Sequence, residues 1–201
     1  MKIICIGRNY AAHAKELGNE VPESPVIFCK PDTALLKNEE PFYHPDFSNE
    51  IQHELELVIR IQKMGKKIQK QFAHLYYSEI SVGLDFTARD KQTELKQKGL
   101  PWELAKAFDG SACIGKFIPF QNHANGIEFS LKKNAELVQV GNSNLMLHSI
   151  DEIISFVSQY FTLKVGDLIY TGTPAGVGKI NIGDTLEAWI GEEKLLHCEV
   201  K

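Results

Sequence analysis

The stretch IQHELELVIRI, residues 51–61, decides the fold class, because it carries the clearest strand pattern in the chain. Its apolar side chains recur mostly at alternate positions, as expected of a β-strand with one buried face. Weaker strand patterns follow the same rule at residues 3–6, 26–28, 80–85 and 129–140, the last of which predicts a hairpin. So many short strands are typical of a β-rich protein.

Four segments predict short helices between these strands: 10–17, 71–77, 88–98 and 149–161. Asn9 is placed to cap the first of them. The last one is amphipathic, with apolar residues at helical spacing. The chain of 201 residues shows no internal repeat and no low-complexity linker. We therefore expect a single domain over residues 1–201 with a β-rich α+β fold.

Composition excludes several classes of partner. Charged residues make up 24% of the chain and the net charge is −4, so a generalised nucleic-acid surface is not expected. No apolar stretch is long enough to span a bilayer or to act as a signal segment, so no membrane partner is expected. The four cysteines are scattered and contain no CxxC pair, which favours a reducing compartment. Together these features predict a cytoplasmic location.

The strand over residues 51–61 carries two acidic residues, Glu54 and Glu56, on one face. Side chains alternate along a strand, so these two carboxylates point the same way and repel each other. If the face is exposed to solvent, no further explanation is needed. If the face lines a cleft, a cation must offset the repulsion, and carboxylate oxygens suit hard ions such as magnesium, manganese or calcium. The spacing alone is compatible with both arrangements.

Two further sites are open to a functional and a structural interpretation. Asp85 stands where an apolar strand ends, so it is either a third metal ligand or a turn and helix cap. His13 and Glu16 are three residues apart on the first predicted helix and can share one face. Such a pair can orient an imidazole as a general base, or can be an ordinary surface pair.

Two apparent motifs do not fit their usual functions. Residues 172–179 (GTPAGVGK) resemble a phosphate-binding loop, but Lys179 is followed by Ile180 instead of Ser or Thr, and Pro174 removes a backbone donor. The HELEL sequence at residues 53–57 lacks the second histidine of a zinc-binding HExxH helix. Neither a nucleotide site nor a zinc site is expected.

Six segments in a fixed order give the chain a family resemblance. They are IGRNYAAHAKE, PVIFCKP, HELELVIRI, GLDFTARD, KGLPWELAKAFDG and GDLIYTGTPAGVG, and they extend over nearly the whole chain. In this order they resemble the fumarylacetoacetate hydrolase superfamily, particularly its short members described as acylpyruvases and oxaloacetate-processing enzymes. The resemblance implies a mixed β-sandwich or roll with a few short helices, usually assembled as a homodimer.

The same resemblance implies roles for nine residues. The metal ligands for Mg²⁺ or Mn²⁺ would be Glu54, Glu56 and Asp85. The catalytic residues would be the acid/base pair His13 and Glu16, on a segment that closes over the substrate, and the active-site lysine Lys106. The substrate-binding residues would be Arg89, Gln92 and Thr173.

The resemblance also implies a divalent-metal-dependent hydrolase or lyase. Such an enzyme would cleave a C–C bond in short 2-oxo acids through an enolate that the metal stabilises, by acylpyruvate hydrolysis or oxaloacetate decarboxylation. Proton transfer alone at the same site would give oxaloacetate tautomerisation. The motifs are compatible as well with an isomerase of the 2-hydroxyhepta-2,4-diene-1,7-dioate type. The carboxylates by themselves would also suit a non-catalytic metal-binding protein.

Overall fold

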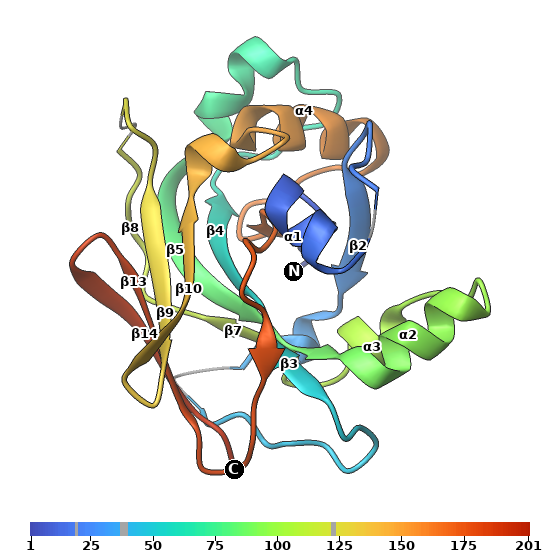
Figure 1. The fold of residues 1–201 in the computed structure, drawn as a ribbon. Coiled ribbons are helices and arrows are strands. Elements are labelled where there is room, and N and C mark those ends of the chain that lie inside the picture. The colour runs from blue at the N-terminus through green and yellow to red at the C-terminus, as the bar shows by residue number, and fades with distance from the viewer. Residues whose placement is uncertain (19, 37–39, 122–123) are drawn as a thin grey trace.

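The computed structural model describes residues 1–18, 20–36, 40–121 and 124–201 (Figure 1). Strands dominate these residues, and the helices are short, so the predicted β-rich α+β class is confirmed. The α-helices are α1 (Ala11–Glu16), α2 (Arg89–Gln97), α3 (Glu103–Lys106) and α4 (Ile150–Tyr160). Three 3₁₀ turns accompany them: η1 (Asp32–Ala34), η2 (Lys70–Tyr76) and η3 (Ser143–Leu145). No helix among the described residues is long and apolar enough to cross a bilayer.

A mixed seven-stranded sheet forms the centre of the molecule. Its order is β2 (Val26–Lys30), β1 (Ile3–Gly7), β11 (Leu168–Tyr170), β4 (Leu55–Ile61), β5 (Tyr77–Asp85) and β7 (Ala112–Ile114), with β8 (Ile118–Pro119) also paired to β5. Strands β1 and β11 run parallel, and the other pairs are antiparallel. Almost every residue of β4 and β5 is buried, as expected for the middle of a sheet covered on both faces.

A second sheet packs against strands β4 and β5 of the first. Its order is β10 (Glu136–Asn142), β9 (Glu128–Lys133), β13 (Thr185–Ile190) and β14 (Glu193–Glu199), which lie together on the left of Figure 1. Strands β9 and β10 are the predicted hairpin. Its turn falls at Asn134 and Ala135, both of which have positive φ. The main apolar core lies between the two sheets.

The predicted strand 51–61 is two strands in different sheets. Strand β3 (Ile51–His53) pairs with β6 (Thr87–Ala88) and β12 (Gly178–Lys179), whereas β4 starts at Leu55 in the central sheet. The side-chain oxygen of Gln139 accepts hydrogen bonds from the Leu55 amide (3.0 Å) and from His53 Nδ1 (2.9 Å). Gln139 thus satisfies backbone and side-chain groups at the break. Glu54 stands at the junction itself.

One local prediction is wrong, and another differs only in the type of helix. Asn9 does not cap the first helix, because its side-chain oxygen accepts a hydrogen bond from the His148 amide (2.8 Å). Its side-chain NH₂ donates to the carbonyl oxygens of Thr171 (2.7 Å) and His148 (3.0 Å). It therefore ties the start of α1 to distant loops instead. The segment predicted as a helix over residues 71–77 is the 3₁₀ turn η2.

The amphipathic helix α4 is confirmed, and its apolar face is buried against η2 and the core. It begins with a capping box. Ser149 accepts a hydrogen bond from the Glu152 amide, and Glu152 accepts one from the Ser149 amide. Lys70 and the Ser149 amide lower the pKa of Glu152 from 4.5 to about 2. This contribution to stability is therefore present above pH 4.5 and is lost as the pH falls through about 2.

Replacing Ser149 with Ala is expected to lower the free energy of unfolding by about 1 kcal/mol, because the α4 cap is lost. Urea denaturation near pH 7 measures this change. Ser155→Ala is the matched control, since Ser155 lies inside α4, where alanine is the better helix former. Equal stability of the two variants would contradict a role for the capping box.

Candidate metal centre and active site

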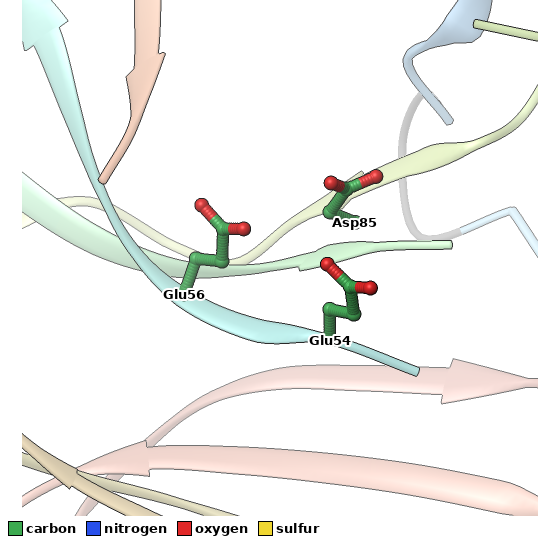
Figure 2. Close-up of side chains that lie close together, drawn as sticks. All are labelled: Glu54, Glu56 and Asp85. Carbon is green, nitrogen blue, oxygen red and sulfur yellow. The ribbon is translucent and has the colours of Figure 1, made fainter. Parts of the chain in front are cut away.

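Three carboxylates meet where β4 and β5 leave the centre of the sheet. Glu54 precedes β4, Glu56 lies within it, and Asp85 ends β5. Figure 2 shows Glu54 and Glu56 extending to the same side, toward Asp85. One ligand oxygen from each lies within 4.8 Å of the others. Their exposed fractions are 5%, 2% and 0%, so a solvent-exposed acidic face is excluded.

A role for Asp85 as a helix cap is also excluded, because α2 begins at Arg89 and its N-cap position is Ala88. The Asp85 side chain instead contacts two buried ammonium groups. Lys106 Nζ donates to Asp85 Oδ2 (2.7 Å), and Lys30 Nζ lies 2.7 Å from Asp85 Oδ1. Asp85 is thus part of the acidic cluster.

Basic side chains neutralise Glu54 as well as Asp85. Lys106 Nζ donates to Glu54 Oε2 (2.8 Å), and Arg89 forms an ion pair with Glu54 Oε1. Burial alone would raise the pKa of Glu54, but the Lys106 and Arg89 cations outweigh burial and hold it well below its ordinary value. Glu54 is therefore ionised at neutral pH.

Glu56 has a different environment. No basic side chain of the described residues forms an ion pair with it, and its Oε2 accepts a hydrogen bond from the Gly172 amide (2.7 Å). Burial, followed by the charges of Asp85 and Glu54, raises its pKa well above the ordinary value. A further positive charge beside Glu56 would relieve this repulsion.

The cluster fits a hard divalent cation. All of its donors are carboxylate oxygens, which are the ligands that Mg²⁺ and Mn²⁺ accept. A carboxylate has about four lone-pair sites, so hydrogen bonds from lysine and arginine leave room for a metal bond. Asp85 Oδ1 is also buried with no hydrogen bond of good geometry. Glu54, Glu56 and Asp85 could therefore hold such an ion together.

His13 and Glu16 lie together on α1. His13 Nδ1 is 3.1 Å from Glu16 Oε2, and the imidazole is buried (4% exposed), whereas Glu16 lies at the surface. The Gly176 amide donates to Glu16 Oε1 (3.0 Å). An ionised Glu16 can only accept, so Nδ1 of His13 donates to it and Nε2 is left as the basic nitrogen.

The glycine-rich segment 171–178 contacts both acidic centres. Its Gly172 amide binds Glu56, and its Gly176 amide binds Glu16. Gly172 has a φ of 104°, and a Cβ there would lie 2.6 Å from the Cβ of Asn9, so the position requires glycine. The segment therefore acts as an anion-binding turn for side chains of its own chain. Thr173, in the same segment, accepts a hydrogen bond from Gln139 Nε2 (3.0 Å).

One cleft brings most of the predicted site residues together. It encloses about 400 Å³ of atom-free space, part of it open to solvent. The predicted residues that line it are His13, Glu54, Glu56, Arg89, Gln92, Lys106 and Thr173. Glu16 contacts His13 and Asp85 contacts Lys106, although neither lines the cleft. The structure thus places all nine in one region, while their individual roles stay predictions.

Sequence reasoning missed two residues of this region. Lys30, at the end of β2, pairs with Asp85 and donates to Ser111 O (2.9 Å) and to the carbonyl of Lys106. The only signal was a lysine directly after the apolar run VIFC, where a strand was expected to end. Gln139 links His53, Leu55 and Thr173, but it lies in a hairpin strand with no distinguishing pattern.

Buried carboxylates, a His–Glu pair and a cleft lined by several basic side chains are the features of an enzyme active site. The chain belongs to the fumarylacetoacetate hydrolase family, since the family model described as fumarylacetoacetate (FAA) hydrolase C-terminal matches residues 2–201. It is therefore an enzyme of this superfamily.

Individual relatives agree with this assignment. Mouse oxaloacetate tautomerase FAHD1, mitochondrial, is 42% identical over 201 residues, which cover 99% of this chain and 91% of the relative. Oxaloacetate tautomerase YcgM of Escherichia coli is 41% identical over 188 residues, or 92% of this chain and 86% of the relative. The structure of fumarylpyruvate hydrolase from Pseudomonas aeruginosa, in complex with Mn²⁺ and pyruvate, matches with a TM-score of 0.92 and 36% identity. That match covers 100% of this chain and 89% of the other. The fold implied by the family resemblance is thereby confirmed.

Proposed function

We propose that this protein is a Mg²⁺- or Mn²⁺-dependent enzyme that forms the enolate of a short 2-oxo acid. Tautomerisation of oxaloacetate is the first activity to test. Hydrolysis of acylpyruvates and decarboxylation of oxaloacetate are further candidate activities, because each releases pyruvate as an enolate that the same site would stabilise. The observation that carries the proposal is the buried cluster of Glu54, Glu56 and Asp85 in the same region as the His13–Glu16 pair. The names of the mouse and bacterial relatives support the substrate class.

Glu54, Glu56 and Asp85 would hold the cation. When bound, the ion supplies positive charge beside the keto oxygen, where negative charge develops during enolisation. Lys106 contacts two of the three ligands and lines the cleft, so its ammonium adds a second positive charge at that place.

His13 is the proposed base. Its Nε2 removes a proton from the carbon next to the keto group, and returns it at the oxygen or carbon to complete tautomerisation. Glu16 orients the ring and stabilises its protonated form, as the carboxylate does in other His–carboxylate pairs. For an acylpyruvate, the same nitrogen would activate a water that attacks the distal carbonyl. Arg89, Gln92 and Thr173 line the cleft and would position the substrate carboxylate.

The test is to strip the purified protein with a chelator, restore Mg²⁺ or Mn²⁺, and assay oxaloacetate and acetylpyruvate side by side. We expect the metal to accelerate oxaloacetate tautomerisation. The loss of the enol absorbance measures this rate. Pyruvate release from acetylpyruvate would show that the protein is also a hydrolase. Metal binding without turnover of either compound, or of dienoic diacids, would favour a non-catalytic metal-binding protein. The homodimer and the cytoplasmic location stay predictions.

A further inference from the structure

Two basic side chains of the cleft form no ion pair within the part of the chain that the structure describes. Arg8 and Lys96 line the same cleft as His13 and Glu54, and neither forms an ion pair with a carboxylate of the described residues. The other basic residues of the lining, Arg89 and Lys106, are already paired with Glu54. The cleft therefore contains two cations that its own carboxylates do not neutralise.

The surroundings make the charge of Lys96 unfavourable. Partial burial, followed by the cations Arg8, Arg89 and Lys106, lowers the pKa of Lys96 from 10.5 to about 8. Its ammonium also lies 5.3 Å from the centre of the Trp102 ring, another residue of the cleft lining. A buried or crowded cation without a counter-charge is costly, so a negative charge in this part of the cleft would be stabilising.

Arg8 reaches the cleft from an unusual backbone conformation. It follows directly after β1 and has a φ of 59°, which residues other than glycine adopt uncommonly. Such conformations concentrate at functional sites, where the surrounding structure compensates for the strain. Its guanidinium is suited to binding a carboxylate with two parallel hydrogen bonds.

Two neighbouring lysines, Lys91 in α2 and Lys98 directly after it, provide a comparison for Lys96. Lys98 is 59% exposed and pairs with Glu94 (2.7 Å), and Lys91 lies 3.7 Å from the same carboxylate. Lys96 is less exposed than Lys98 and yet has no such partner among the described residues. Its position at the cleft, and not its place on α2, distinguishes it from these two.

We propose that Arg8 and Lys96 bind the second carboxylate of a dicarboxylic 2-oxo acid, and so select diacids over monocarboxylic acylpyruvates. The inference rests on the proposed function, because it places the 2-oxo end of the substrate at the carboxylate cluster. Basic residues outnumber acidic ones in the cleft lining, and a divalent cation increases this excess. A substrate with two carboxylates offsets it more completely than a substrate with one.

Binding without turnover tests the inference first. Malate and 2-hydroxybutyrate both have four carbons and a 2-hydroxy acid group, and they differ only in a distal carboxylate or methyl. Calorimetry with Mg²⁺-loaded protein should show tighter binding of malate. Lys96→Gln and Arg8→Gln should each weaken malate binding by about ten-fold, since a charge-assisted hydrogen bond is lost. Binding of 2-hydroxybutyrate should change by less than about two-fold. Lys98→Gln is the matched control and should change neither.

Turnover provides the second measurement. The same variants should raise KM for oxaloacetate by about ten-fold and leave kcat and the KM for acetylpyruvate nearly unchanged. Equal losses for the diacid and the monoacid, or no preference for malate in the unmodified protein, would overturn the inference. A malate preference that depends on Lys96, in a protein that turns over no 2-oxo acid, would support the subsite while rejecting the proposed reaction. Turnover with no such preference would reject the subsite alone.

Discussion

Replacing Glu56 with Gln is expected to abolish turnover while leaving the metal-free protein at least as stable as the unmodified one. Loss of one ligand and one negative charge removes several kcal/mol of transition-state stabilisation, or about 1,000-fold in rate. Glutamine has the same shape and can still accept the hydrogen bond from the Gly172 amide. It also removes a carboxyl whose pKa is raised by burial and by repulsion from Asp85 and Glu54.

The stability effect has a definite pH dependence. A carboxyl whose pKa is raised by folding destabilises the folded state once it must ionise, so the contribution of Glu56 to the stability of the metal-free protein falls as the pH rises above the ordinary value of 4.5. The Gln variant lacks this contribution. Thermal unfolding in the presence of a chelator should therefore give similar midpoints at pH 4.5 and a higher midpoint for the variant at pH 8.

Glu54→Gln is the matched control for Glu56→Gln, because it makes the same change at the neighbouring carboxylate of the cluster. Glu54 is paired with Lys106 and Arg89, so its neutralisation leaves two buried cations without their counter-charge. We expect it to lower the free energy of unfolding by about 3 kcal/mol. If both variants destabilised the metal-free protein equally, the distinct role inferred for Glu56 would be wrong.

Replacing His13 with Ala is expected to have the second largest effect. Loss of a positioned general base typically reduces the rate by ~10²–10⁴-fold. Oxaloacetate tautomerisation and acylpyruvate hydrolysis should both fall, because each needs a proton transfer. His13 is not part of the carboxylate cluster, so Mn²⁺ binding, measured by calorimetry, should remain close to that of the unmodified protein.

The Glu16→Gln variant tests whether Glu16 only orients the His13 ring or also stabilises its protonated form. The side-chain oxygen of glutamine can still accept from His13 Nδ1, but a neutral amide does not stabilise a charged imidazole. The rate should fall less than in His13→Ala, and the acidic limb of the pH–rate profile, where the base becomes protonated, should move to lower pH. Full activity of His13→Ala would reject the pair as the acid/base group.

The strands and the amphipathic helix could be predicted because their patterns are local. The hydrophobic alternation around Leu55 and the apolar spacing in α4 both follow from side-chain periodicity within one segment. Alternation also placed Glu54 and Glu56 on one face correctly. The nine candidate residues were assigned from whole motifs in the order typical of a family, and the structure places them in one region.

The remaining features depend on contacts between distant segments. Strand β3 ends before β4 because Gln139, far along the chain, bonds to His53 and Leu55 at the break. Lys30 is buried because Asp85 and Ser111 meet it from other elements. Asn9 is a good cap residue, but the distant His148 amide occupies the side-chain oxygen that a cap would use. No window of sequence around any of these residues contains its partner.

The glycine-rich segment 171–178 holds some residues of the site by hydrogen bonds and leaves others unattached to it. Its backbone amides hold Glu56 and Glu16 at once, so a shift of this loop would displace a proposed metal ligand and the proposed acid/base pair together. Lys96 belongs to the same lining but extends from α2, which this loop does not hold. A substitution at Lys96 would thus alter which acids bind without moving the loop that holds Glu56 and Glu16.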